Sequence, residues 1–278
     1  MIRARAHPYV SIVPIAALFA VGGDVVPAAA QTRDPAVTEF RLVSDLLSTS
    51  SLWVNPAGLG FHTRRSSLMG NLTWDRPEDG DWSLGQYLIG VAADIVGFGY
   101  EHDEFQSGAF SQGDAYTLAL GVASRDAAIG VSRTWRTVGE SQGSWVVGFG
   151  FVKPTAAIGL VWRDIGSPTV RDTVRDKRLI GAVTAQPSRG PVILEAELDY
   201  NLKDKGLRVF RVGAGMTLKG KLRARGLLGW DGDGKFVGFV ISGDLRLGKS
   251  TAWGAAGLDA GGDAGNGNLG LDFTHQRR

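Results

Sequence analysis

The sequence predicts an all-β fold: a membrane-spanning, antiparallel up-and-down β-barrel of about 14 strands, preceded by a short N-terminal helical or plug segment. Segments of about nine to eleven residues alternate apolar with small or polar positions, and this is the length that a tilted strand needs to cross a bilayer. The connections alternate between short turns and longer loops. Large aromatic residues gather at the strand ends that border the longer loops.

These aromatic residues include six of the eight tryptophans. Indole and phenol rings prefer the headgroup boundary of a membrane, so we expect a girdle at one level of the barrel. A soluble β-sandwich would show the same alternation, but it has no reason to sort its aromatic residues to one end. The predicted girdle consists of Trp74, Trp82, Tyr100, Tyr116, Trp135, Trp145, Trp162, Tyr200, Trp230 and Phe236.

The N-terminus has the pattern of a secretory signal peptide. Arg3 and Arg5 supply the positive start, an apolar stretch follows, and Ala28-Ala29-Ala30 fits an A-x-A cleavage site. An uncleaved membrane anchor is the alternative, but the apolar stretch is short and Pro14 interrupts it. We therefore expect export through a cleavable signal peptide to the bacterial outer membrane.

The sequence predicts three parts: a signal peptide (1–30), an N-terminal helix and plug segment (31–65), and a transmembrane β-barrel (66–278). Within the second part, apolar positions in residues 35–47 recur close to helical spacing, and residues 48–63 are irregular. The barrel is one domain, because a partial barrel in lipid would leave an unpaired edge.

An even number of strands is expected in the third part, as in bacterial outer-membrane barrels. Alternation and turn residues mark the boundaries. The expected strands span 66–74, 82–91, 94–103, 114–123, 126–136, 144–152, 155–163, 178–186, 191–201, 207–218, 221–230, 236–247, 250–258 and 267–275.

Charged residues alternate with apolar ones in several of these strands. A lipid-facing Arg or Lys near the bilayer midplane costs roughly 2–4 kcal/mol, so these charges are expected inside the barrel and paired across strands. This interpretation is favoured over a polar substrate path or catalysis by paired carboxylates. The predicted lumen charge ladder is Glu195, Glu197, Asp199, Arg211, Arg223, Arg225, Asp244 and Arg246.

Just before the first strand, residues 51–61 read SLWVNPAGLGF. This stretch resembles the N-P-A segment near the mature N-terminus of FadL-like outer-membrane proteins, and its wording is closer to the PorV/PorQ branch linked to type IX secretion. The resemblance implies that the N-terminal segment lies within the barrel. Asn-Pro followed by Ala-Gly is otherwise an ordinary turn. The candidate plug and ligand-region residues are Trp53, Asn55, Pro56, Ala57 and Gly58.

Two other sequence motifs do not indicate a catalytic or calcium-binding site. Gly139-Glu140-Ser141-Gln142-Gly143 matches the G-x-S-x-G pattern, but the expected hairpin loop lacks the strand–turn–helix context of a nucleophile elbow. Asp231-Gly232-Asp233-Gly234 is read as a tight turn and not as a calcium loop, because the later ligands are missing. The chain has no cysteine and a net charge of +2. We expect no enzyme, no cofactor, no metal and no nucleic-acid partner.

Two functions stay open. One is passive transport or binding of hydrophobic small molecules, which the resemblance and the glycine-rich wall favour. The other is a non-conducting PorV/PorQ-like barrel that serves as a structural or secretion-associated scaffold for a protein partner, which the compact loops and the sequence of the N-P-A stretch favour. In both cases outer-membrane lipid surrounds the barrel.

Overall fold

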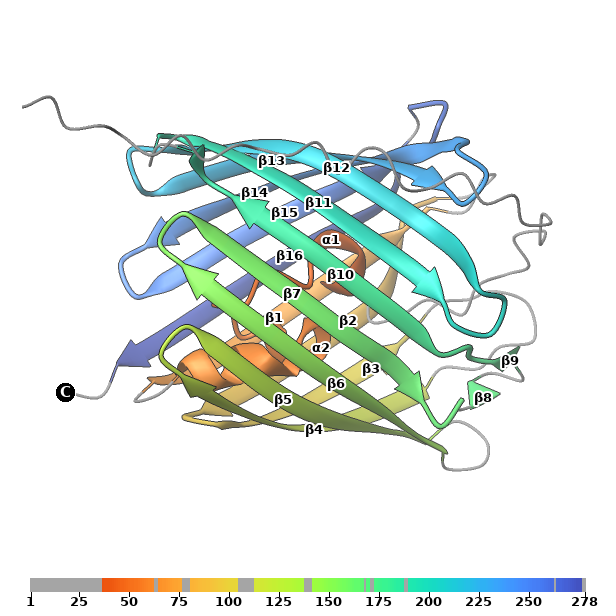
Figure 1. Cartoon of the computed structure of the whole chain (residues 1–278), viewed down its shortest axis with the longest axis horizontal. Coiled ribbons are helices and arrows are strands. Elements are labelled where there is room, and N and C mark those ends of the chain that lie inside the picture. Colours follow the sequence, from red (N-terminus) through yellow and green to blue (C-terminus); the bar gives the residue numbers. More distant parts are fainter. Residues whose placement is uncertain are drawn as a thin grey trace, which may run out of the picture.

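The computed structural model describes residues 37–62, 65–76, 81–104, 113–137, 142–167, 169–170, 173–187, 190–262 and 264–276. The predicted signal peptide lies outside these residues. A closed barrel of long, tilted strands surrounds a set of short helices (Figure 1). Its strands are β1 (Arg65–Asp75), β2 (Ser83–Ala93), β3 (Val96–Asp103), β4 (Gly113–Ser124), β5 (Ala127–Arg136), β6 (Gln142–Lys153), β7 (Ala156–Ile165), β10 (Arg178–Ala185), β11 (Val192–Asn201), β12 (Gly206–Leu218), β13 (Leu222–Asp231), β14 (Phe236–Leu247), β15 (Ser250–Leu258) and β16 (Ala264–Gln276).

Each barrel strand pairs antiparallel with its neighbours in the chain, and β1 pairs with β16 to close the sheet. The two short strands β8 (Thr169–Val170) and β9 (Thr173–Val174) form a separate sheet in the connection between β7 and β10. The predicted fold class, an antiparallel barrel of 14 strands, is therefore confirmed. The strand bounds agree with the expected ones to within three residues.

The two faces of the wall have opposite character. On β11, Leu194 is 45% exposed on the outer face, whereas its neighbour Glu195 is only 4% exposed on the inner face. The same alternation is clear on β4 and β5, with mostly apolar side chains outside and small or polar ones inside. An apolar outer surface is what a barrel surrounded by lipid requires.

Residues 37–62, which we call the internal segment, lie inside the barrel (Figure 1). They contain α1 (Val37–Phe40), α2 (Ser51–Val54) and the 3-10 helix η1 (Pro56–His62). The expected helix over residues 35–47 is wrong beyond α1, and the stretch expected to be irregular contains α2 and η1. Wall carboxylates take the backbone donors that a longer helix would use: Val43 N donates to Glu197 (3.1 Å) and Thr49 N donates to Asp272 (3.0 Å).

The aromatic side chains that end the strands at the longer loops lie on the outer face, either exposed or half-buried. Several touch across neighbouring strands, including Tyr100 with Tyr116 at 5.5 Å between ring centroids. The remaining two tryptophans, Trp53 and Trp253, are buried inside the barrel. In the described part of the chain, no helix is long and apolar enough to cross a membrane.

Candidate functional site

Asn55 is the first residue of the N-P-A stretch and is completely buried. Its side-chain amide donates to the carbonyl oxygens of Val43 (2.9 Å) and of Phe149 on β6 (3.0 Å), while its Oδ1 accepts from Ala57 N (3.2 Å). Asn55 therefore caps the start of η1, because its Oδ1 accepts from a backbone N–H in the first turn of that helix. The stretch is also attached to the barrel wall through Phe149.

Inward-facing glycines give the internal segment room against one half of the wall. A Cβ at Gly159 would lie 1.9 Å from the carbonyl oxygen of Val43, and one at Gly130 would lie 2.3 Å from the carbonyl carbon of Pro56. No real Cβ approaches a backbone atom so closely, so these positions admit only glycine while the segment is in place. We call this surface the glycine trough; it comprises Gly90, Gly97, Gly99, Gly121, Gly130, Gly148, Gly150 and Gly159.

Two further predicted residues, Ala57 and Gly58, are closely packed within the internal segment. A Cβ at Gly58 would lie 2.5 Å from the Cβ of Ser51 and 2.6 Å from the carbonyl oxygen of Leu46. Ala57 is fully buried. The absence of a side chain at Gly58 therefore lets η1 pack closely against α2 and Leu46 within the segment.

Trp53 fills a slot in the trough between β2 and β3. Its six-membered ring would lie 2.4 Å from a Cβ at Gly99 and 2.8 Å from one at Gly90, so the indole lies directly on the backbone of the wall. The side chain is 3% exposed, and its Nε1 has no hydrogen-bond partner among the described residues. The contacts of the ring with the wall at Gly90 and Gly99 are therefore packing contacts that do not use the indole N–H.

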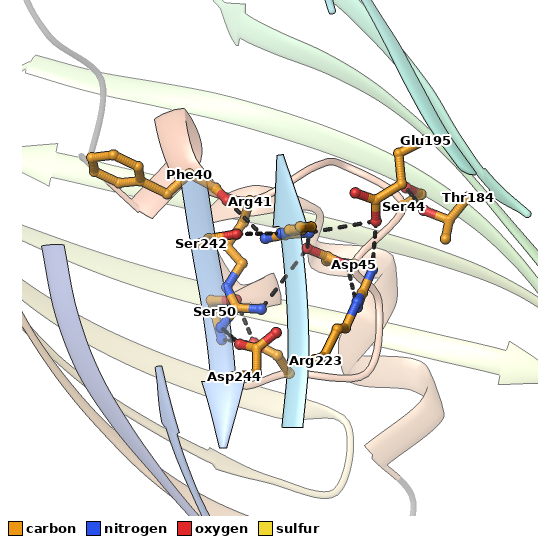
Figure 2. A network of polar contacts seen from close by, with 12 residues as sticks. Phe40, Arg41, Ser44, Asp45, Ser50, Thr184, Glu195, Arg223, Ser242 and Asp244 are labelled. Carbon is orange, nitrogen blue, oxygen red and sulfur yellow. Dashed lines mark hydrogen bonds and ion pairs between the residues drawn. The ribbon is translucent and has the colours of Figure 1, made fainter. Parts of the chain in front are cut away.

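A cluster of charged residues holds the opposite side of the internal segment (Figure 2). Asp45 accepts from Arg225 at 2.7 Å and lies 3.5 Å from Arg223. Arg41 donates to Asp244 on β14 at 2.6 Å. We call this group the ionic cluster; it consists of Arg41, Asp45, Glu195, Arg223, Arg225 and Asp244.

The electrostatics of the cluster favour an ionised Asp45. Burial raises the pKa of its carboxyl, but the guanidinium groups of Arg225, Arg223 and Arg41 outweigh burial and lower the pKa well below its ordinary value. Arg225 also donates to Ser242 (2.7 Å) and to the carbonyl oxygen of Phe40 (2.8 Å). The segment is thus attached to β13 by both a charge pair and a backbone contact.

The other residues of the predicted lumen charge ladder are divided among separate contacts. Glu197 accepts from Val43 N and lies 3.4 Å from Arg211. Asp199 pairs with Arg178 and Arg208, nearer the long-loop end. Arg246 is exposed at the short-turn end and makes no ion pair with any described residue. The structure does not bring it together with the others.

Sequence reasoning missed several residues of this site. Arg163 on β7 donates to the carbonyl oxygens of Trp53 (2.7 Å) and Val54 (3.0 Å), at the end of α2. Arg41 also stacks on Trp253, 4.4 Å from the ring centroid. Alternation places Arg163 on the inner face, because it follows the outward Trp162. This alternation would have placed Arg163 in the predicted lumen charge ladder.

The structure describes only one of the two motifs that match a catalytic or calcium-binding pattern. Residues 138–141, which hold most of the G-x-S-x-G match, lie outside the described residues. Asp231 accepts from the backbone of Asp233 (3.0 Å) and Lys235 (2.9 Å), as in the predicted tight turn. Within the described ranges, no three His, Cys, Asp or Glu residues are grouped closely enough to hold a metal ion.

Comparison with known proteins identifies the fold but no family. No protein-family model and no curated protein matches the chain. Among solved structures, the CymD monoaromatic hydrocarbon channel aligns with a TM-score of 0.54 and 9% identity, over 84% of this chain and 94% of that one. A triple mutant of the Rh. blastica porin aligns with a TM-score of 0.45 and 9% identity, over 76% and 99%. The chain therefore has the fold of the outer-membrane β-barrels, as the CymD alignment shows.

Proposed function

We propose that this protein is a bacterial outer-membrane barrel through which small apolar or amphipathic molecules pass, and that the internal segment controls this passage. The observation that carries the proposal is the slot occupied by Trp53. An apolar aromatic ring lies there on bare backbone, and its one polar atom has no partner. Withdrawal of Trp53 would leave an apolar space that fits a single aromatic molecule.

The two attachments of the segment differ in a way that suits such a gate. On the glycine trough the contacts are close and apolar, whereas on the β13 and β14 side they are ion pairs and hydrogen bonds. Water and ions can replace ion pairs when the segment moves, because charged side chains are readily solvated. Apolar cargo would then take the place of the apolar side chains of the segment.

The similarities agree with this proposal without naming a cargo. One solved structure that aligns over 84% of the chain is a monoaromatic hydrocarbon channel. The N-P-A stretch resembles that of the FadL-like proteins, which include hydrocarbon transporters. Membership of that superfamily, and of its PorV/PorQ branch, is part of the proposal.

We further propose that the long loops face the cell exterior. Outer-membrane barrels have long extracellular loops and short periplasmic turns. The internal segment joins β1 at Arg65, at the same end as the short turn between β2 and β3, where Ala93 pairs with Ser66. The segment would then enter the barrel from the periplasm, after removal of residues 1–30 as a signal peptide.

A reversible cross-link tests the gate. The hydroxyls of Ser44 and Thr184 lie 2.8 Å apart, one on the segment and one on β10, and the chain has no cysteine of its own. In the double variant Ser44→Cys/Thr184→Cys, oxidation should fix the segment to the wall. Uptake of the apolar dye N-phenyl-1-naphthylamine by intact cells should fall on oxidation and recover on reduction.

The matched control is a cross-link within the wall. Thr117 on β4 and Thr134 on β5 also have hydroxyls 2.8 Å apart, and Thr117→Cys/Thr134→Cys leaves the segment free. Oxidation of this pair should not change dye uptake. Unchanged uptake in the cross-linked Ser44/Thr184 variant would refute the gate.

A non-conducting PorV/PorQ-like scaffold for a protein partner is the second candidate. The observation that favours it is the number of strands to which the segment is attached: Asp45 pairs with Arg225 on β13, Asn55 donates to Phe149 on β6, and Thr49 donates to Asp272 on β16. If cells that express the wild-type protein take up no more dye than cells without it, the scaffold is the better interpretation.

A further inference from the structure

Arg133 on β5 faces the lipid and not the lumen. Its neighbours Ser132 and Thr134 are buried inside the barrel, and the hydroxyl of Thr134 bonds to that of Thr117. In the register, Arg133 lies between Leu118 and Trp145, whose side chains are exposed on the outer face. A lipid-facing arginine is costly at the midplane of a bilayer and cheap only near its boundary, so its position needs a reason.

The side chain of Arg133 lies between two indole rings of the predicted girdle. Its Cζ is 5.0 Å from the ring centroid of Trp135 and 5.1 Å from that of Trp145. Gly143 leaves the room for this arrangement, because a Cβ there would lie 3.2 Å from Nε and 3.4 Å from Nη2. Cation–π attraction from two sides fixes the direction in which the guanidinium points.

The guanidinium of Arg133 has N–H donors that no described residue uses. Its Nε is covered by the protein beside Gly143, and among the described residues no carboxylate forms an ion pair with Arg133, so the terminal N–H groups are the donors that a ligand can use. A guanidinium carries five N–H donors in a fixed plane and matches the oxygens of a phosphate group in pairs. An oriented cation at a headgroup boundary, flanked by indoles, therefore fits a phosphorylated lipid headgroup.

We propose that Arg133, Trp135 and Trp145 bind the phosphate group of a phosphorylated glycolipid in the outer leaflet. All three lie at the long-loop end of β5 and β6, and the outer leaflet of a bacterial outer membrane consists largely of such a lipid. The inference rests on the outer-membrane placement and the orientation proposed above. It does not depend on passage of molecules through the lumen.

The experiment titrates purified full-length protein in detergent with bis-phosphorylated lipid A and detects complexes by native mass spectrometry. Arg133→Gln should bind lipid A at least about tenfold more weakly, as expected for the loss of one hydrogen bond to a charged group. Lys249→Gln, which removes a cation at the short-turn end, is the matched control and should bind as the wild type does.

Two results would overturn the proposal. One is equal binding of lipid A by the wild type and Arg133→Gln, or an equal loss in Lys249→Gln. The other is wild-type binding of phosphatidylglycerol as tight as that of lipid A, because the site would then accept any anionic lipid. Dephosphorylated lipid A should bind no better to the wild type than to Arg133→Gln.

A second variant keeps the test decisive if Arg133→Gln does not fold. Trp145→Leu leaves the charge and removes one ring, and it should weaken lipid A binding about two- to fivefold. Heat-modifiable migration on a gel checks that each variant is a folded barrel. The side chains of Arg133 and Trp145 do not line the lumen, so both variants should keep wild-type dye uptake. The dye-uptake experiment therefore tests the gate independently of lipid A binding.

Discussion

Replacement of Asp45 by asparagine should release the internal segment from the wall. The change keeps the size of the side chain and removes its charge. In the wild type, Asp45 lies 2.7 Å from Arg225, 3.5 Å from Arg223 and 4.0 Å from Arg41. The Arg225 side chain is only 1% exposed, so its charge needs a partner within the protein.

The size of the effect follows from what Arg225 retains. Removal of one partner from a buried ion pair typically costs about 3–5 kcal/mol. Arg225 would keep Glu195 at 3.6 Å, Ser242 and the carbonyl oxygen of Phe40, which places the loss at the lower end of that range. A change of about 3 kcal/mol corresponds to roughly a hundredfold larger population of the released segment.

Arg41 provides the assay, because it is the single Lys or Arg between residues 37 and 62. It is buried in the folded protein, so trypsin can cleave after it only when the segment leaves the wall. When opening and closing are fast relative to cleavage, the rate of cleavage follows the open population. Mass spectrometry of the released N-terminal peptide should therefore show roughly a hundredfold faster cleavage in Asp45→Asn.

The control is the same chemical change in an exposed ion pair. Asp126, in the turn between β4 and β5, pairs with Lys153 at the end of β6, and the two side chains are 30% and 48% exposed. Exposed pairs contribute about 0–1 kcal/mol, so Asp126→Asn should leave cleavage at Arg41 nearly unchanged. If Asp45→Asn is cleaved no faster than Asp126→Asn, the ionic cluster does not hold the segment.

Three further predictions use the same cleavage assay. Gly130→Ala should accelerate cleavage at Arg41, because its Cβ would lie 2.3 Å from the segment backbone and overpacking typically costs about 1–3 kcal/mol. Gly226→Ala, whose Cβ meets nothing within 4 Å, should not accelerate cleavage. Equal cleavage rates in the two variants would show that the trough is not tightly packed. Burial lowers the pKa of His62 below its ordinary value of 6.5, because the buried site disfavours the charged imidazolium. His62 therefore takes up a proton more readily when the segment is released than when it is in place. The segment should therefore be fully held above pH 6.5 and released increasingly as the pH falls below it, and a His62→Gln variant with the same pH profile would contradict this. Trp53→Phe should change the rate little, because Nε1 has no partner, whereas Trp53→Ala should cost about 3–5 kcal/mol. A large effect of Trp53→Phe would mean that the indole N–H is recognised after all.

Much of the wall could be predicted from the sequence because each strand has one face in lipid and one in the lumen. The expected strands 236–247 and 250–258 have the observed bounds of β14 and β15. Strand β16 begins at Ala264 instead of 267, since its first residues pair with β15 without the apolar pattern that marks the membrane. The strands β8 and β9, with two residues each, are too short to show any period.

The interior was predictable only in part. Alternation placed Glu195 and Arg223 on one face, and they lie 2.5 Å apart. Asp45 was not foreseen as their partner, because apolar spacing around it suggested a helix. A contact between residues so far apart in the chain depends on where the segment lies in the lumen, and no local pattern carries that information.

The bond between Thr49 and Asp272 has a consequence for how the barrel closes. Asp272 lies on β16, opposite Met69 of β1, and a slip of one residue at this last pairing would turn its carboxylate towards lipid. An early part of the chain thus fixes the register of the strand made last. We expect the internal segment to act as a template for assembly, so that a barrel folded without it would close in more than one register.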